Sequence, residues 1–161
     1  MVSKKDLSEQ DIRTKFITPA IEKAGWDRMT QLGEDVPLTD GKIFIRGNLF
    51  ARGKLKRADY VLYYKPNIPI AIIEAKDNNH SVRSGIQQAL GYRELLKDVP
   101  CVYSSNGDAF FEHDFTSSNG KIEREISLDE FPTPEELWKR YKKLNLSLIH
   151  ISEPTRLLSN S

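Results

Sequence analysis

Residues 57–76 read RADYVLYYKPNIPIAIIEAK, which is two short apolar runs joined by a polar segment that contains proline. The runs at residues 61–64 and 70–73 are rich in the β-branched, aromatic and aliphatic side chains that favour strands. Residues 65–69 carry two prolines and an asparagine, which are typical of a tight turn. The stretch therefore predicts a β-hairpin centred between Pro66 and Asn67.

This register would bring three charged side chains together. It places Asp59 directly across from Glu74, and side chains opposed in this way lie about 5 Å apart at their Cβ atoms. Because side chains alternate between the two faces of a strand, Lys76 lies on the same face as Glu74, and Ala75 lies on the other. We expect two carboxylates and one amine to meet at one point.

Such a group suits the Mg²⁺-dependent hydrolysis of a phosphodiester. Asp59 and Glu74 offer the hard oxygen ligands that Mg²⁺ prefers, and the ion keeps several waters while binding a phosphate oxygen. Lys76 has three open roles: it orients the attacking water, deprotonates it, or offsets charge on the phosphate. The alternative is an ordinary cross-strand ion pair on an edge hairpin. The apolar run before Glu74 favours the site, because charges at the end of a buried strand are seldom solvated surface.

Composition indicates one domain. The chain has 161 residues, of which 39% are hydrophobic, so it is long and apolar enough to bury a core. Its net charge of +1 does not by itself indicate a nucleic-acid binder. Cys101 is the one cysteine, which excludes an intramolecular disulfide and suits a reducing compartment. We find no signal peptide and no apolar run long enough to cross a bilayer, so we expect a cytoplasmic protein with no membrane partner.

Basic side chains are concentrated just before Asp59. The cluster has almost no acidic residue within it and consists of Arg46, Arg52, Lys54, Lys56 and Arg57. It would flank the predicted site and could hold a DNA phosphate backbone, with Lys56 and Arg57 nearest to the carboxylates. A solvated loop explains the cluster equally well.

Helix and strand patterns follow one another along the chain. Ser8 is a candidate N-cap for a helix that bends near Pro19, and Thr133 is a candidate N-cap for another. Asn106 and Gly107 form a short-hairpin signal. The other predicted elements are strands at residues 29–36, 42–46, 101–105 and 109–113 and a helix at residues 81–96. This order predicts an α/β fold.

Gln88 and Tyr92 are a second chemical signal. They lie one turn apart on the predicted helix at residues 81–96, so both side chains can reach the same place. An amide and a hydroxyl can hydrogen-bond phosphate oxygens without reading base sequence. Taken alone, the pair is better explained by Tyr92 packing in the core and Gln88 being exposed.

Asp59, then Glu74-x-Lys76, then Gln88-x-x-x-Tyr92 resemble the active-site pattern of the PD-(D/E)xK nuclease superfamily. More narrowly, the chain resembles the N-terminal nuclease domain of the restriction (R) subunit of type I restriction–modification enzymes. The resemblance runs from about residue 8 to residue 144. Its best-matching stretches are residues 8–13, 19–21, 24–26, 57–64, 105–107 and 131–138.

The resemblance implies a restriction-endonuclease-like mixed β-sheet flanked by helices. It also implies that Asp59 and Glu74 bind Mg²⁺, that Lys76 is the catalytic amine, and that Gln88 and Tyr92 help to position DNA. In the family, an ATP-driven translocase follows this domain, and the subunit acts with methylation and specificity subunits. ATP is thus expected only for that motor, and the chain carries no Gly-rich Lys-Ser/Thr phosphate loop.

Two positions qualify the resemblance. Ala58 stands where the superfamily name has proline, which leaves the carboxylate of Asp59 in place. Glu9 sits where related nucleases often carry a further acidic residue on the first helix. Two alternatives remain at this point: a stand-alone repair or phage nuclease, and a non-catalytic DNA-binding module of the same fold.

The end of the chain has a different character. Residues 146–156, LSLIHISEPTR, resemble a translation of the transposon-end adapter used in sequencing libraries. We therefore expect an endonuclease domain at residues 1–145 and a non-native tail at residues 146–161 that packs poorly, so that the chain is a truncated R subunit. A genuine amphipathic C-terminal segment is the alternative.

Overall fold

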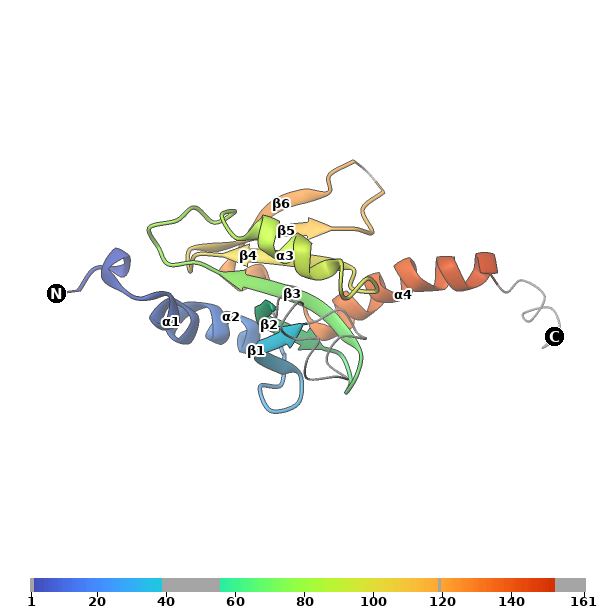
Figure 1. Cartoon of the computed structure of the whole chain (residues 1–161), viewed down its shortest axis with the longest axis horizontal. Coiled ribbons are helices and arrows are strands. Elements are labelled where there is room, and N and C mark those ends of the chain that lie inside the picture. The colour runs from blue at the N-terminus through green and yellow to red at the C-terminus, as the bar shows by residue number, and fades with distance from the viewer. Residues whose placement is uncertain (1, 39–55, 119, 153–161) are drawn as a thin grey trace, which may run out of the picture.

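The computed structural model describes residues 2–38, 56–118 and 120–152, with residues 147–152 described by their backbone alone. These residues form a six-stranded sheet whose strands follow one another in sequence order (Figure 1). Every neighbouring pair is antiparallel except β3 and β4, which are parallel. The strands are β1 Leu32–Leu38, β2 Lys56–Tyr63, β3 Pro69–Ala75, β4 Cys101–Ser105, β5 Ala109–Asp114 and β6 Glu123–Ser127.

Helices cover both faces of this sheet, which confirms the predicted α/β class. Ile72 and Ile73 are adjacent in β3, yet they belong to two different apolar cores because a strand turns successive side chains to opposite faces. The N-terminal helices and α4 pack on the core that contains Ile73, and α3 packs on the core that contains Ile72. The helical elements are η1 Lys4–Asp6, α1 Glu9–Ile12, the π-helical η2 Arg13–Ile17, α2 Thr18–Lys23, α3 Ile86–Arg93, η4 Leu128–Glu130 and α4 Pro134–Ser152.

The predicted hairpin is present, and its predicted register holds up to Leu62, after which an irregularity shifts the pairing by one residue and places Tyr63 opposite Pro69. Tyr60 lies opposite Ile73 and Val61 lies opposite Ile72, as a turn centred between Pro66 and Asn67 requires. Asn67 has a positive φ of 70°, a conformation that asparagine tolerates better than most residues. The second predicted hairpin, at residues 101–105 and 109–113, is confirmed as β4 and β5.

The N-terminal helix differs from the prediction by more than a bend. Arg13–Ile17 adopts π-helical geometry between α1 and α2. Pro19 has no N–H to donate to the carbonyl four residues earlier, which favours a local change of hydrogen-bond pattern at this point. Ser8 does cap α1, because its side chain accepts a hydrogen bond from the backbone N–H of Asp11 at 3.1 Å.

Two further elements were predicted wrongly or not at all, and a third is not tested. β1 begins at Leu32 rather than at residue 29, because the side chain of Asp27 accepts hydrogen bonds from Met29 and Thr30 and closes a turn. β6 was not predicted, since its sequence EREIS is mostly charged, as suits an edge strand. The strand predicted at residues 42–46 lies outside the described residues.

The predicted helix at residues 81–96 shortens to α3 Ile86–Arg93. The N–H of Gly85 binds the Ser104 hydroxyl at 2.8 Å instead of a helical carbonyl, so the regular helix starts only after Gly85. At the other end, Leu95 and Leu96 donate to carbonyls three residues earlier, which tightens the last turn.

The last helix opens as predicted, with the Thr133 hydroxyl accepting a hydrogen bond from Glu136 N–H at 3.1 Å. α4 then continues past Asn145, extending beyond the sheet, and Leu146 is exposed (Figure 1). The boundary at residue 145 and the origin of the tail stay predictions. None of the described helices is long and apolar enough to span a membrane.

The β4–β5 turn gives a test of the packing against α1. Gly107 has φ of 89°, and a Cβ atom there would lie 2.8 Å from Ile12 Cγ2, whereas Gly120 has φ of 83° and open space around it. We expect Gly120→Ala to lower the free energy of unfolding by about 1–2 kcal/mol through backbone strain alone. Gly107→Ala should lower the free energy of unfolding by about 1–3 kcal/mol more than Gly120→Ala does, because Ile12 must move. Equal losses in urea unfolding would show that α1 does not pack tightly on this turn.

Candidate active site

Asp59 and Glu74 lie at the same end of the β2–β3 hairpin. The pairing of Tyr60 with Ile73 continues by one residue to place Asp59 opposite Glu74. Asp59 Oδ2 accepts a hydrogen bond from the N–H of Ala75 at 2.8 Å, so the neighbouring strand fixes this half-buried carboxylate. The structure therefore brings the two predicted carboxylates together.

Glu74 is an unusually placed acid. It is only 5% exposed, and its Oε2 atom is buried without a hydrogen-bonding partner among the residues described. Burial and, after it, the adjacent Asp59 raise the pKa of Glu74 to about 10, although Tyr92 and Lys76 act in the opposite direction. A buried carboxyl oxygen with no donor is costly unless another group satisfies it.

The surroundings of Glu74 come from α3 and β4. Ser104 lies beside Glu74 in the parallel β3–β4 pair, and its hydroxyl holds the N–H of Gly85 at the start of α3. A Cβ atom on Gly85 would lie 3.1 Å from Glu74 Cβ and 3.2 Å from its Cγ. Glycine at this position therefore allows α3 to begin directly over the stem of Glu74.

Tyr92 and Gln88 have different environments on α3. Tyr92 is buried in the core on that face, and it lies close enough to Glu74 to lower the pKa of that carboxyl. Burial, followed by the charge of Glu74, raises the pKa of Tyr92 to about 12. Gln88, one turn earlier, is exposed. Tyr92 thus lies with Asp59 and Glu74 in the candidate site, whereas Gln88 faces solvent.

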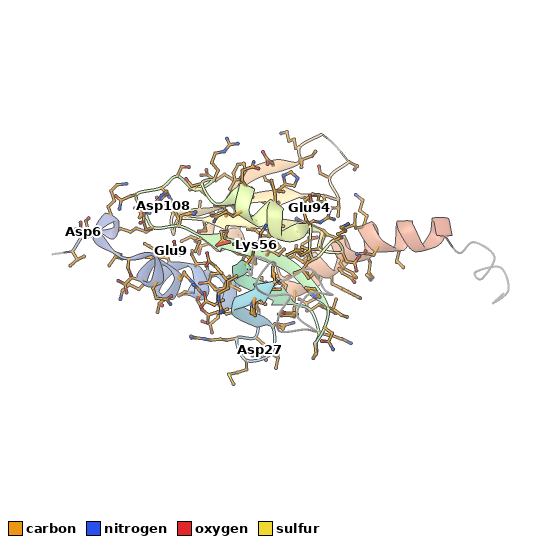
Figure 2. The ribbon with its side chains drawn as sticks, viewed as in Figure 1. Asp6, Glu9, Asp27, Lys56, Glu94 and Asp108 are labelled. Carbon is orange, nitrogen blue, oxygen red and sulfur yellow. The ribbon has the colours of Figure 1, made fainter. Side chains whose placement is uncertain are left out.

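Lys76 and Glu9 complete the charged surroundings. Lys76 is half-buried just after β3, its backbone N–H binds the Ser105 carbonyl at 2.9 Å, and its charge acts on both Glu74 and Glu9. Glu9, on α1, is exposed; partial desolvation and then the charge of Asp59 raise its pKa (Figure 2). The first helix therefore brings a third carboxylate into the electrostatic field of the pair.

Arg13 is a neighbour that sequence reasoning missed. This buried residue of η2 donates from Nη2 to the main-chain carbonyl of Asp59 at 3.1 Å, and its Nη1 lies 3.6 Å from Asp59 Oδ1. Nη1 also pairs with Asp35 at 2.9 Å. A single arginine in an amphipathic helix gives no sequence signal for such a role, because most arginines are exposed.

The predicted DNA-contacting basic residues are only partly described. Lys56 and Arg57 are exposed at the start of β2, two or three residues before Asp59. Lys56 is labelled in Figure 2. The other members of the cluster, Arg46, Arg52 and Lys54, lie outside the described residues. Across the described part of the chain, no group of three or more His, Cys, Asp or Glu side chains is arranged to hold a metal ion, so a metal here would rest on two carboxylates.

Comparison with known proteins identifies the family. Residues 45–121 match the family model described as the type I restriction enzyme R protein N terminus. The chain is 50% identical over 137 residues to the type I restriction enzyme EcoAI endonuclease subunit of Escherichia coli, covering 84% of this chain and 17% of that protein. The chain belongs to the family of type I restriction enzyme R protein N-terminal domains.

A solved structure agrees with this assignment. A fragment assigned to an HsdR subunit of a type I restriction enzyme from Vibrio vulnificus YJ016 superimposes with a TM-score of 0.68 at 37% identity. The match covers 84% of this chain and 25% of that one. This R protein N-terminal domain therefore spans a quarter or less of the length of both relatives, and its fold is that of the HsdR fragment.

The raised pKa of Glu74 predicts how the stability of this R protein domain depends on pH in EDTA. Because the folded-state pKa of about 10 exceeds the ordinary value of 4.5, the stabilisation is complete below pH 4.5 and is lost as pH rises toward 10. Relative to Glu74→Gln, the free energy of unfolding should fall by about 1.4 kcal/mol per pH unit within that window.

Urea unfolding at a series of pH values measures this slope. The exposed Glu94 gives the control, since Glu94→Gln removes the same charge without altering a buried carboxyl and should follow the unmodified protein. Parallel profiles for Glu74→Gln and the unmodified protein would contradict the perturbed titration.

Proposed function

We propose that this R protein domain is a Mg²⁺-dependent DNA endonuclease domain in which Asp59 and Glu74 hold the ion. The observation that carries the proposal is the buried Oε2 of Glu74, which has no hydrogen-bonding partner in the described part of the chain and lies beside a second carboxylate. A hard cation would satisfy that oxygen, and Mg²⁺ is commonly bound through one or two carboxylates with the remaining ligands supplied by water and phosphate. When bound, Mg²⁺ would neutralise charge on the phosphate and help to activate water.

The protein residues supply the remaining functions. The β3 N–H of Ala75 fixes one oxygen of Asp59 and leaves the other directed elsewhere. Tyr92 favours the charged form of Glu74, the form that binds a cation. Lys76 lies beside the pair with its amine in the same field, where it can orient the attacking water or offset negative charge on the phosphate.

DNA would approach over the start of β2 and the exposed side of α3. Lys56 and Arg57 are exposed there and supply positive charge, and Gln88 supplies an amide. These groups contact phosphate rather than base edges, so the domain would cut without reading sequence. The names of the relatives, a type I restriction enzyme R protein and an endonuclease subunit, further support DNA as substrate and a place within an enzyme of several subunits. From the resemblance of the sequence to this family, we also propose methylation and specificity subunits as partners, ATP only for the translocase of the intact subunit, and a cytoplasmic location.

Lys76→Ala separates an endonuclease from a DNA-binding module. We expect the rate of supercoiled-plasmid nicking in Mg²⁺ to fall by about 10²–10⁴-fold, as for loss of a positioned proton-transfer group, while DNA affinity changes little. The control is Lys65→Ala, which removes an exposed lysine at the turn end of the same hairpin and should leave nicking unchanged.

EDTA should abolish nicking by the unmodified protein, and DNA affinity should weaken with increasing salt because phosphate contacts release counterions. DNA binding with no Mg²⁺-dependent nicking would favour the non-catalytic module. Nicking with a full dependence on Mg²⁺ but equal rates in Lys76→Ala would remove Lys76 from the reaction.

A further inference from the structure

Asp35 of β1 has a backbone conformation that residues other than glycine rarely adopt within a strand. Its φ is 52°, in the left-handed region, and it lies within a strand rather than in a turn. Glu34 pairs with Tyr60 and Val36 pairs with Ala58, so Asp35 stands opposite Asp59 at the point where the regular β1–β2 pairing is interrupted. Asp59 therefore has an opposed carboxylate on each side, Asp35 on β1 and Glu74 on β3.

In both strands, the regular alternation of side chains between the two faces of the sheet is interrupted at this row. Leu32 packs on the core of the N-terminal helices, whereas Val36 and Leu38, which an unbroken strand would place on the same face, pack on the α3 core. In β2, Tyr60 and Ala58 likewise belong to different cores although they are two residues apart. The distortion is thus shared by the two strands and centred on the row that contains Asp59.

The side chain of Arg13 lies between the two aspartates of this row. Nη1 is 2.9 Å from Asp35 Oδ1, which is a charged hydrogen bond, and 3.6 Å from Asp59 Oδ1, which is beyond hydrogen-bonding distance. The guanidinium is also held by the Asp59 carbonyl at 3.1 Å and lies 4.9 Å from the centre of the Tyr60 ring. The same arginine nitrogen is therefore committed to Asp35 and not to Asp59.

We propose that Asp35 is a positioning residue for the cation site, which acts by holding the Arg13 guanidinium away from the Asp59 carboxylate. This inference rests on the proposed function, in which Asp59 binds Mg²⁺. With Oδ2 of Asp59 already engaged by Ala75, Oδ1 is the oxygen with capacity for a metal ion. Without Asp35, the guanidinium is free to form a direct ion pair with Oδ1 and compete with the cation.

If the role of Asp35 were purely structural, its removal would lower stability, and neither its packing nor its backbone conformation gives a reason to expect this. Its side chain is 57% exposed, so its removal opens no cavity. Glycine and asparagine both tolerate a positive φ, so Asp35→Gly and Asp35→Asn preserve the backbone conformation. Asp35→Asn keeps an acceptor for Arg13 but removes the charge, and Asp35→Gly removes both.

Equilibrium binding of Mn²⁺ to the full chain, followed by electron paramagnetic resonance, gives the readout, with Glu74→Gln defining the specific signal. We expect Asp35→Gly to weaken Mn²⁺ binding by about tenfold and Asp35→Asn by a smaller factor, because a charged hydrogen bond holds the guanidinium in place. Glu34→Gln is the matched control: it removes a charge 3.4 Å from the same arginine and should change binding less than twofold. Melting temperatures should not fall in the Asp35 variants.

The nicking assay provides a second, independent measure. In Asp35→Gly, the Mg²⁺ concentration for half-maximal nicking should rise by about tenfold while the rate at saturating Mg²⁺ recovers. If Mn²⁺ affinity in Asp35→Gly equals that of the unmodified protein or of Glu34→Gln, this inference is overturned and the proposed function stands. If the unmodified protein binds no Mn²⁺, or if Glu74→Gln binds Mn²⁺ equally well, the proposed function and this inference are both overturned.

Discussion

The arrangement of the site depends on the register of the β2–β3 hairpin. Because side chains alternate with a period of two, a slip of one residue would turn Asp59 and Glu74 to opposite faces and separate them. The register is held by buried pairs such as Tyr60 with Ile73 and Val61 with Ile72, which belong to two different cores. A slip would therefore disrupt both faces of the sheet at once, and this cost fixes the two carboxylates together.

The described part of the chain contains two buried glutamates, and the contrast between them indicates which one serves chemistry. Glu112, at 1% exposure, accepts from Tyr103 at 2.7 Å and pairs with Arg124 at 2.8 Å and Arg140 at 3.0 Å. All of its oxygens are satisfied within the protein, as expected of a structural ion cluster. Glu74 has an acidic neighbour and an orphaned oxygen instead. Folding alone does not account for that choice, because a neutral or apolar residue would be less costly there.

The sequence predicted the parts of this structure that follow from local periodicity. The hairpin register, the Asn106-Gly107 turn and the Thr133 cap are each set by a few neighbouring residues and were predicted correctly. The length of α3 was not, because it depends on a hydrogen bond between Gly85 and Ser104, which are far apart in sequence. β6 escaped prediction because an edge strand needs few apolar side chains.

The contact between Arg13 and the Asp35–Asp59 row shows a more general limit. Each of the three residues lies in a different element, and none has a sequence context that marks it, yet together they explain a positive φ, an interrupted strand pair and a change of face in two strands. A distortion of this kind is costly and persists where surrounding structure demands it. The π-helical η2 carries Arg13, whose guanidinium pairs with Asp35 at 2.9 Å where the regular β1–β2 pairing is interrupted. The irregular features of β1 and β2 therefore meet at one row, where Arg13 pairs with Asp35 and Asp59 lies between two other carboxylates.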